Sequence, residues 1–136
     1  HINNKYYSQH FEDSFNYLHS NPYAMYLYLL SQEAAYTLQN ENYANKFFYL
    51  NKIKHSLDIY YKVKLPEIFL FMHPIGTIIG NGSFGDFLVV YHSVTVGGKV
   101  GEFKYPQIGK DVTLYANSTL IGDCKIGNRV VIGANT

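Results

Sequence analysis

Histidine is the side chain best suited to move a proton near neutral pH, and His73 is the most unusually placed of the six histidines. It lies directly before Pro74 and six residues before Ile79, where the hexapeptide repeat described below would carry an aliphatic residue. A histidine that replaces an aliphatic residue in a repeat requires an explanation. The spacing alone leaves two interpretations equally open, a hydrogen-bonded structural histidine or a general base.

The other reactive residues and the charge exclude several classes of site. The histidines form no HExxH or comparable pair, so we predict no metal site. Cys124 is the single cysteine, which excludes an internal disulfide framework and fits a reducing compartment. A net charge of +1 without a basic run argues against nucleic-acid binding, and no stretch of the chain is apolar enough to span a membrane. We expect a cytoplasmic protein with a packed core.

The elements that must position His73 follow from a six-residue repeat in the second half of the chain. Aliphatic residues recur without a break at Ile108, Leu114, Leu120, Ile126 and Ile132. A small or β-branched residue follows each of them by four positions. This pattern is typical of a parallel β-helix, in which three hexads make one triangular coil and the aliphatic side chains fill its interior. Val90 and Val96 keep the same phase upstream.

The repeat has two irregularities and an open end. Residues 97–107 break the pattern, with Glu102 where an aliphatic residue should stand. This segment is either a poor pair of hexads or an extruded loop that returns in register. Residues 79–83 are one short of a hexad, so the phase shifts there. The repeat is unfinished at Thr136, which predicts further coils after it.

The first half of the chain is predicted to be helical. Asn21 and Pro22 form a helix start signal, with Asn21 as the N-cap and Pro22 at the first helical position. Apolar residues at helical spacing predict helices at 6–18, 23–38 and 42–57. We therefore expect an α+β protein, with a helical domain over 1–57 and a β-helix over 58–136.

Three segments of the second half resemble the serine acetyltransferase family. They are His73–Gly80 (HPIGTIIG), Tyr91–Gly98 (YHSVTVGG) and Tyr105–Gly109 (YPQIG). The similarity reaches back through residues 50–59 and covers roughly 45–136. It implies a left-handed parallel β-helix that assembles as homotrimers or dimers of trimers. It also implies transfer of an acetyl group from acetyl-CoA to the hydroxyl of L-serine.

The resemblance assigns roles to individual residues. His73 corresponds to the family's catalytic base, and Asp58, fifteen residues earlier, to the aspartate that orients it. Gly98 corresponds to the glycine whose backbone N–H faces the thioester oxygen. Ala116 and Ala134 correspond to alanines that line the groove for the pantetheine arm of acetyl-CoA. A base, an orienting group and an oxyanion donor are what acetyl transfer to a hydroxyl requires.

The residues expected to hold the acceptor depart from the family pattern. Met72 stands where the family carries an aspartate that helps hold the substrate. Lys104 and Tyr105 replace an Arg-His pair, and lysine keeps the charge without the bidentate fork of arginine. His92 is a further candidate for acceptor contact. These changes put L-serine in doubt and make a sugar on a polysaccharide precursor an alternative acceptor.

Each assignment has a structural alternative. Asp58 could cap a loop, with Glu67 as the competing orienting group, and Gly98 could be a simple turn residue. The two alanines could be ordinary corner packing. If all of these hold, the chain is a β-helix scaffold for oligomerisation or interaction without catalysis.

Overall fold

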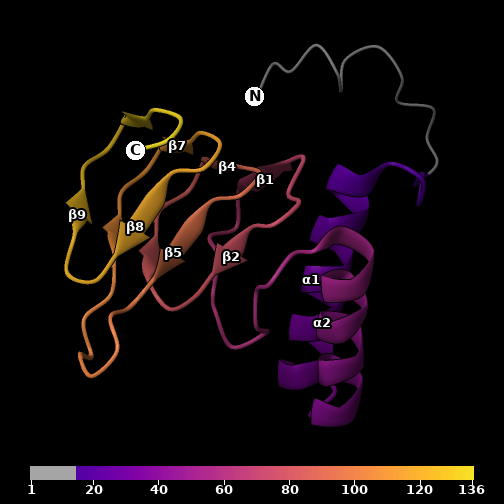
Figure 1. Ribbon diagram of the computed structural model, residues 1–136. Helices are drawn as coiled ribbons and strands as arrows, with labels where there is room; N and C mark the ends of the chain where they lie inside the picture. The colour runs from indigo at the N-terminus through magenta and orange to yellow at the C-terminus, as the bar shows by residue number, and fades with distance from the viewer. Residues whose placement is uncertain (1–14) are drawn as a thin grey trace.

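The computed structural model describes residues 15–136, and its two helices lie at one end of a stack of strands (Figure 1). Helix α1 spans Ser20–Tyr36 and α2 spans Glu41–His55. They pack against each other, and Asn51 Nδ2 on α2 donates to the carbonyl oxygen of Ala24 on α1 at 2.9 Å. Neither helix in the described residues is both long and apolar enough to cross a bilayer.

The second helix has well-formed caps at both ends. The side chain of Asn40 accepts a hydrogen bond from the backbone N–H of Tyr43 at 3.1 Å, which satisfies one of the free donors of the first turn. At the other end, Ser56 adopts a left-handed conformation with φ of 49° and stops the helix. The helix predicted over 42–57 is therefore found with slightly earlier bounds.

The start of the first helix differs from the prediction. The N-cap is His19, so the expectation that Asn21 caps this helix is wrong. The side-chain oxygen of Asn21 bonds instead to a distant part of the chain, described below. The helix predicted at 6–18 lies mostly outside the described residues, and 15–18, which the structure describes, are not helical.

Ten short strands follow the helices in the described residues, and each forms one side of a triangular coil. They are β1 Phe69–Met72, β2 Ile78–Ile79, β3 Ser83–Phe84, β4 Leu88–Tyr91, β5 Thr95–Gly97, β6 Gln107–Ile108, β7 Thr113–Leu114, β8 Thr119–Ile121, β9 Lys125–Ile126 and β10 Val131–Ile132. They form three parallel sheets, in the orders β1-β4-β7-β10, β2-β5-β8 and β3-β6-β9. This confirms the predicted class, a helical segment followed by a parallel β-helix.

The aliphatic repeat fills the interior of the coils. The strand register stacks Phe71, Val90, Leu114 and Ile132 in one column. The first three side chains are fully buried, and each such burial contributes about 1.5–3 kcal/mol. Cys124 packs partly buried against the same core, as predicted for a small interior residue.

The break in the repeat is an extruded loop rather than a pair of poor hexads. Val96 pairs with Leu120, 24 residues later, whereas Ile108 pairs with Ile126, 18 residues later. The additional residues between β5 and β6 leave the coil as the loop 98–106, and the chain then returns in register. This loop projects as the orange hairpin in Figure 1.

His73 does not occupy an interior position, which corrects the expectation from the repeat. Phe71 and Thr77 fill the interior of this coil and are fully buried, whereas His73 is exposed. The reason is a longer corner, because residues 73–77 separate β1 from β2 while only 92–94 separate β4 from β5. The additional corner residues take His73 out of the six-residue phase.

The helices and the first coils share one large hydrophobic cluster. Ala24 and Tyr28 of α1 belong to the same buried cluster as Phe71 of β1. The hydroxyl of Tyr28 donates to the Val63 carbonyl at 2.8 Å and accepts from the Leu65 N–H at 3.0 Å. Burial raises the pKa of Tyr28 to about 12, so the hydroxyl stays protonated. This cluster contains residues from both sides of the domain boundary predicted at 57/58. That boundary therefore remains a prediction.

Candidate functional site

Four of the predicted site residues lie along one edge of the β-helix. We call this the histidine edge, which joins the β1-β4-β7-β10 sheet to the β2-β5-β8 sheet. Strand register pairs Met72 with Tyr91, Val90 with Leu114, and Leu114 with Ile132. At the corners that follow, Asn117 N–H donates to the His92 carbonyl and Asn135 N–H to the Ala116 carbonyl, so His92, Ala116 and Ala134 stack in one column. His73 lies in the longer corner above this column, where Ile75 rather than His73 is bonded to the coil below.

The corner at His73 is held by hydrogen bonds from three other segments. The Asn21 side-chain oxygen accepts the backbone N–H of His73 at 2.9 Å, and the Ser56 carbonyl accepts the N–H of Gly76 at 3.0 Å. From the coil below, Ser93 N–H donates to the Ile75 carbonyl at 2.9 Å. His73 itself has φ of 53°, an uncommon conformation for a residue other than glycine. The corner is thus set by tertiary contacts and leaves the imidazole accessible.

Asp58 lies one coil above β2, near the top of the histidine edge. Its backbone bridges Ile78, with Asp58 N–H donating to the Thr77 carbonyl and the Ile79 N–H donating to the Asp58 carbonyl, both at 2.9 Å. Its carboxylate is about one-third exposed and forms an ion pair with Lys52 Nζ at 2.7 Å. Asp58 and His73 therefore come to the same end of one face, but in this structure the carboxylate pairs with Lys52.

The other predicted residues lie on a second edge, which we call the loop edge. It joins the β2-β5-β8 sheet to the β3-β6-β9 sheet and carries the loop 98–106. A Cβ added at Gly98 would lie 2.8 Å from the ring of Tyr105, so glycine is needed for this close approach. Lys104 Nζ pairs with the Asp123 carboxylate at 3.1 Å. Gly98, Lys104 and Tyr105 thus occupy the end of β5 opposite to His92.

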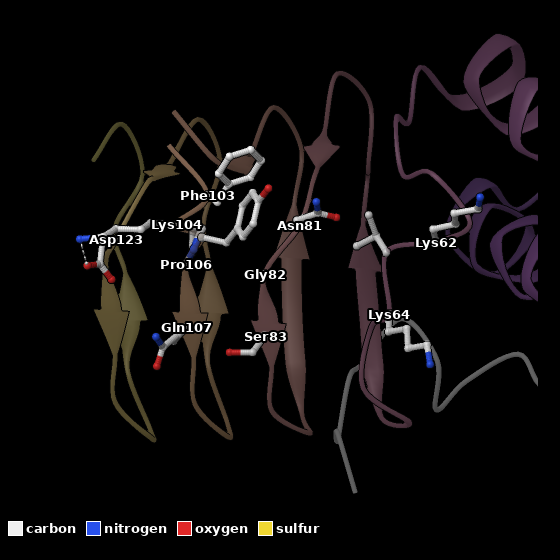
Figure 2. A pocket seen from close by; sticks show the side chains of 12 residues that line it. Lys62, Lys64, Asn81, Gly82, Ser83, Phe103, Lys104, Pro106, Gln107 and Asp123 are labelled. Atoms are coloured by element: carbon white, nitrogen blue, oxygen red, sulfur yellow. Dashed lines mark ion pairs between the residues drawn. The ribbon is translucent and has the colours of Figure 1, made fainter. Parts of the chain in front are cut away.

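An open pocket of about 750 Å³ lies at the loop edge (Figure 2). Phe103 stands at its upper rim and the Lys104–Asp123 pair at one side, while Lys62 and Lys64 lie at the far side. Lys62 is itself paired with Glu41 at 3.4 Å. Most of the positive charge around the pocket is therefore already partnered.

Met72, the remaining predicted acceptor residue, is only 5% exposed in β1. Its predicted role in acceptor binding remains a prediction. Sequence reasoning missed Asn21, which it interpreted as a helix cap, and Lys52, which no motif marks. In both cases the contact joins residues from different elements, so no local signal could have found it.

The described residues include one buried histidine near this region. His55 is 9% exposed, its ring packs edge-on against Tyr23, and its Nε2 has no hydrogen-bond partner in the described part of the chain. Burial, followed by the nearby charge of Lys54, lowers the pKa of His55 from its ordinary value of 6.5. No group of three or more His, Cys, Asp or Glu side chains gathers as a metal site within residues 15–136.

Comparison with known proteins first defines the class. Residues 105–136 match the family described as "Bacterial transferase hexapeptide (six repeats)". A serine acetyltransferase of Staphylococcus epidermidis is 32% identical over 90 residues, which are 64% of this chain and 42% of that protein. The chain thus spans less than half the length of this curated relative. These matches confirm the resemblance to the serine acetyltransferase family.

Solved structures agree on the fold. Serine acetyltransferase isoform 3 of Entamoeba histolytica, in complex with cysteine, superposes with a TM-score of 0.73 and 26% identity. That alignment covers 85% of this chain and 42% of the other. A serine acetyltransferase of Brucella abortus in complex with coenzyme A gives a TM-score of 0.76 at 19% identity, covering 85% and 47%. At that identity the second likeness shows the fold alone.

Proposed function

We propose that the chain carries part of the site of an acetyl-CoA-dependent O-acetyltransferase, in which His73 is the general base. The column at the histidine edge supports this most directly. An extended pantetheine arm needs small residues along an edge, and its thioester must end beside the base. Ala116 and Ala134 provide such residues below His73. The name of the curated relative points to the same chemistry.

The reaction then follows from ordinary acyl-transfer chemistry. The neutral imidazole of His73 takes the proton of the acceptor hydroxyl as the oxygen attacks the thioester carbonyl and the C–O bond forms. The Gly98 backbone N–H stabilises the oxyanion of the tetrahedral intermediate. The C–S bond then breaks, and the CoA thiolate takes the proton from the imidazolium. This restores neutral His73 and releases CoA.

In this proposal Asp58 orients His73 and stabilises its charged form. The carboxylate lies on the same edge and is one-third exposed, so a side-chain rotation can exchange Lys52 for the imidazole N–H. A carboxylate in that position fixes the tautomer of the base, as in other base–orienter pairs. Lys52 is then the partner of the Asp58 carboxylate in the resting state.

We further propose that the complete site forms between copies of the chain, in a left-handed β-helix that assembles as a homotrimer or a dimer of trimers. Gly98 and Lys104 lie at one end of the β5 strand and His92 at the other, so one chain keeps the two edges apart. Val100 and Phe103 project from the loop 98–106 and are almost fully exposed. Exposed apolar side chains of this kind mark an interaction surface. In this assembly the loop of one copy would reach the histidine edge of the next. We place the assembly in the cytoplasm.

Two acceptors compete in this proposal. The relatives' name favours L-serine, whose carboxylate needs a cation. Two observations favour a sugar instead, because Met72 is apolar and buried, and the Lys104 amine is already paired with Asp123. Binding a sugar hydroxyl requires neither a carboxylate side chain at position 72 nor an unpaired cation at position 104.

The test is CoA release from acetyl-CoA by the complete native chain that contains this sequence, assayed with L-serine and with a panel of amino sugars and sugar nucleotides. His73→Asn serves as the matched inactive control. Turnover with L-serine supports the serine acceptor, and turnover only with a sugar supports a rebuilt acceptor pocket. Release no faster than in the His73→Asn variant, with every acceptor, would contradict catalysis and favour the scaffold alternative.

A further inference from the structure

The side chain of Asn21 connects the first turn of α1 to the backbone of His73. Asn21 is 4% exposed, and its Oδ1 accepts the His73 N–H at 2.9 Å although the two residues are 52 positions apart. Figure 1 shows α1 standing beside the end of the sheet that begins with β1. This contact joins the helical half directly to the proposed base.

The His73 N–H needs such a partner because of its place in the fold. Strand β1 is the first strand of its sheet, so β4 lies on one side of it and helix α1 covers it from the other. A backbone N–H on an edge facing the helix finds no neighbouring coil to accept it. Leaving this partly buried N–H unpaired would cost stability and would free the first residue of an unusually long corner.

The same asparagine does little for its own helix. It lies inside the first turn of α1, where the N-cap position belongs to His19. An asparagine is unfavourable within a helix because its side chain competes for backbone groups, and its preferred place is the cap. Asn21 therefore departs from the helix preference of its own segment, and its side chain bonds to a distant backbone N–H instead. Such departures are expected at functional sites.

We propose that Asn21 is a positioning residue for His73, acting through the backbone rather than on the substrate. By accepting the His73 N–H it holds this residue in its left-handed conformation at the top of the histidine edge. The position of the exposed imidazole above the lower coils is thereby fixed through its own backbone. This inference rests on the proposed role of His73 as the base.

The experiment compares Asn21→Ala with Asn51→Ala in the complete native chain. Asn51 is a matched control, because it is 3% exposed and its side chain also bonds to a distant backbone group, with Nδ2 donating to the Ala24 carbonyl between the helices. We expect both variants to lose stability. Only Asn21→Ala should lower kcat, by about tenfold or more, because a base displaced by an ångström loses most of its efficiency. The KM for acetyl-CoA should stay within about twofold in both variants, since the groove lies on the lower coils.

Two further measurements separate positioning from simple stability. Asn21→Asp keeps the acceptor oxygen, so it should recover most of the kcat that Asn21→Ala loses. Hydrogen exchange of the peptide containing residues 70–76 should accelerate in Asn21→Ala but not in Asn51→Ala. Equal kcat in the two alanine variants, or no recovery in Asn21→Asp, would overturn the inference. Full activity of His73→Asn would instead overturn the proposed function on which it rests.

Discussion

The top and the bottom of the β-helix are built by different rules. In the lower coils, Leu114 and Ile132 stack in register, and the corners of the histidine edge are short, with three residues at 92–94 and four at 115–118. In the first coil, the corner 73–77 is longer, and hydrogen bonds from Asn21 and Ser56 hold it in place of a neighbouring coil. The comparison indicates that the repeat supplies a regular scaffold and that His73, the proposed base, lies where the repeat is broken.

The largest effect is expected at the top of the histidine edge. Replacing His73 by alanine should lower kcat by about two to four orders of magnitude, because the general base is lost. Circular dichroism and the unfolding midpoint should stay close to those of the native protein, since His73 is exposed. Turnover near that of the native chain would contradict the assignment of the base.

The next effect concerns the lower coils and is one of stability. Leu114→Ala removes a fully buried side chain from the interior column and should destabilise the fold by about 2–5 kcal/mol, as measured by urea unfolding. Thr113→Ala on the same strand, where the side chain is only half-buried, is the control and should cost less than about 1 kcal/mol. Equal losses would mean that the column is not the main source of stability.

A smaller effect should separate orientation from binding. Asp58→Asn should lower kcat on the order of tenfold to a hundredfold, because the base loses its orienting carboxylate. The affinity for acetyl-CoA, measured by calorimetry, should change little because the alanine groove is untouched. A large loss of acetyl-CoA binding would show that Asp58 is structural instead. Lys52→Met, which removes the resting partner of Asp58, should affect kcat less than Asp58→Asn.

The smallest effect is a pH dependence at the junction of helices and coils. Because burial lowers the pKa of His55 in the folded state, the unfolded chain takes up a proton first as the pH falls below 6.5. Folding stability should therefore be full above this pH and decrease as the solution is acidified. His55→Phe keeps the ring contact with Tyr23 and should lose less stability between pH 7.5 and 5.5. Identical pH profiles of the two proteins would contradict this.

Much of the lower β-helix could be predicted from the sequence. The five aliphatic residues from Ile108 to Ile132 are sufficient to predict the β-helix, because each hexad repeats the same local contacts. The interior place of Cys124 followed from the same phase. The phase failed for His73, since the position of a residue in a repeat predicts its direction only while every corner has the same length.

The structure brings only some of the predicted site residues together, and the reason is again geometric. Resemblance to a family selects His73, Asp58 and Gly98 one residue at a time, and it carries no information about which edge each one occupies. The register then separates Gly98 from His73 by the width of one face. The ion pair of Asp58 with Lys52 likewise joins two elements and has no counterpart in the pattern of residues.

The sequence by itself determined the class of fold, because a hexapeptide period and a buried aliphatic column are local properties of each coil. The resemblance carried by its motifs also singled out His73 as the proposed base. The tertiary structure alone established that His73 is exposed, that His92, Ala116 and Ala134 stack on the same edge, and that Asn21 accepts the His73 backbone N–H. These features depend on corner length and on contacts between residues far apart in the chain, which no local periodicity encodes.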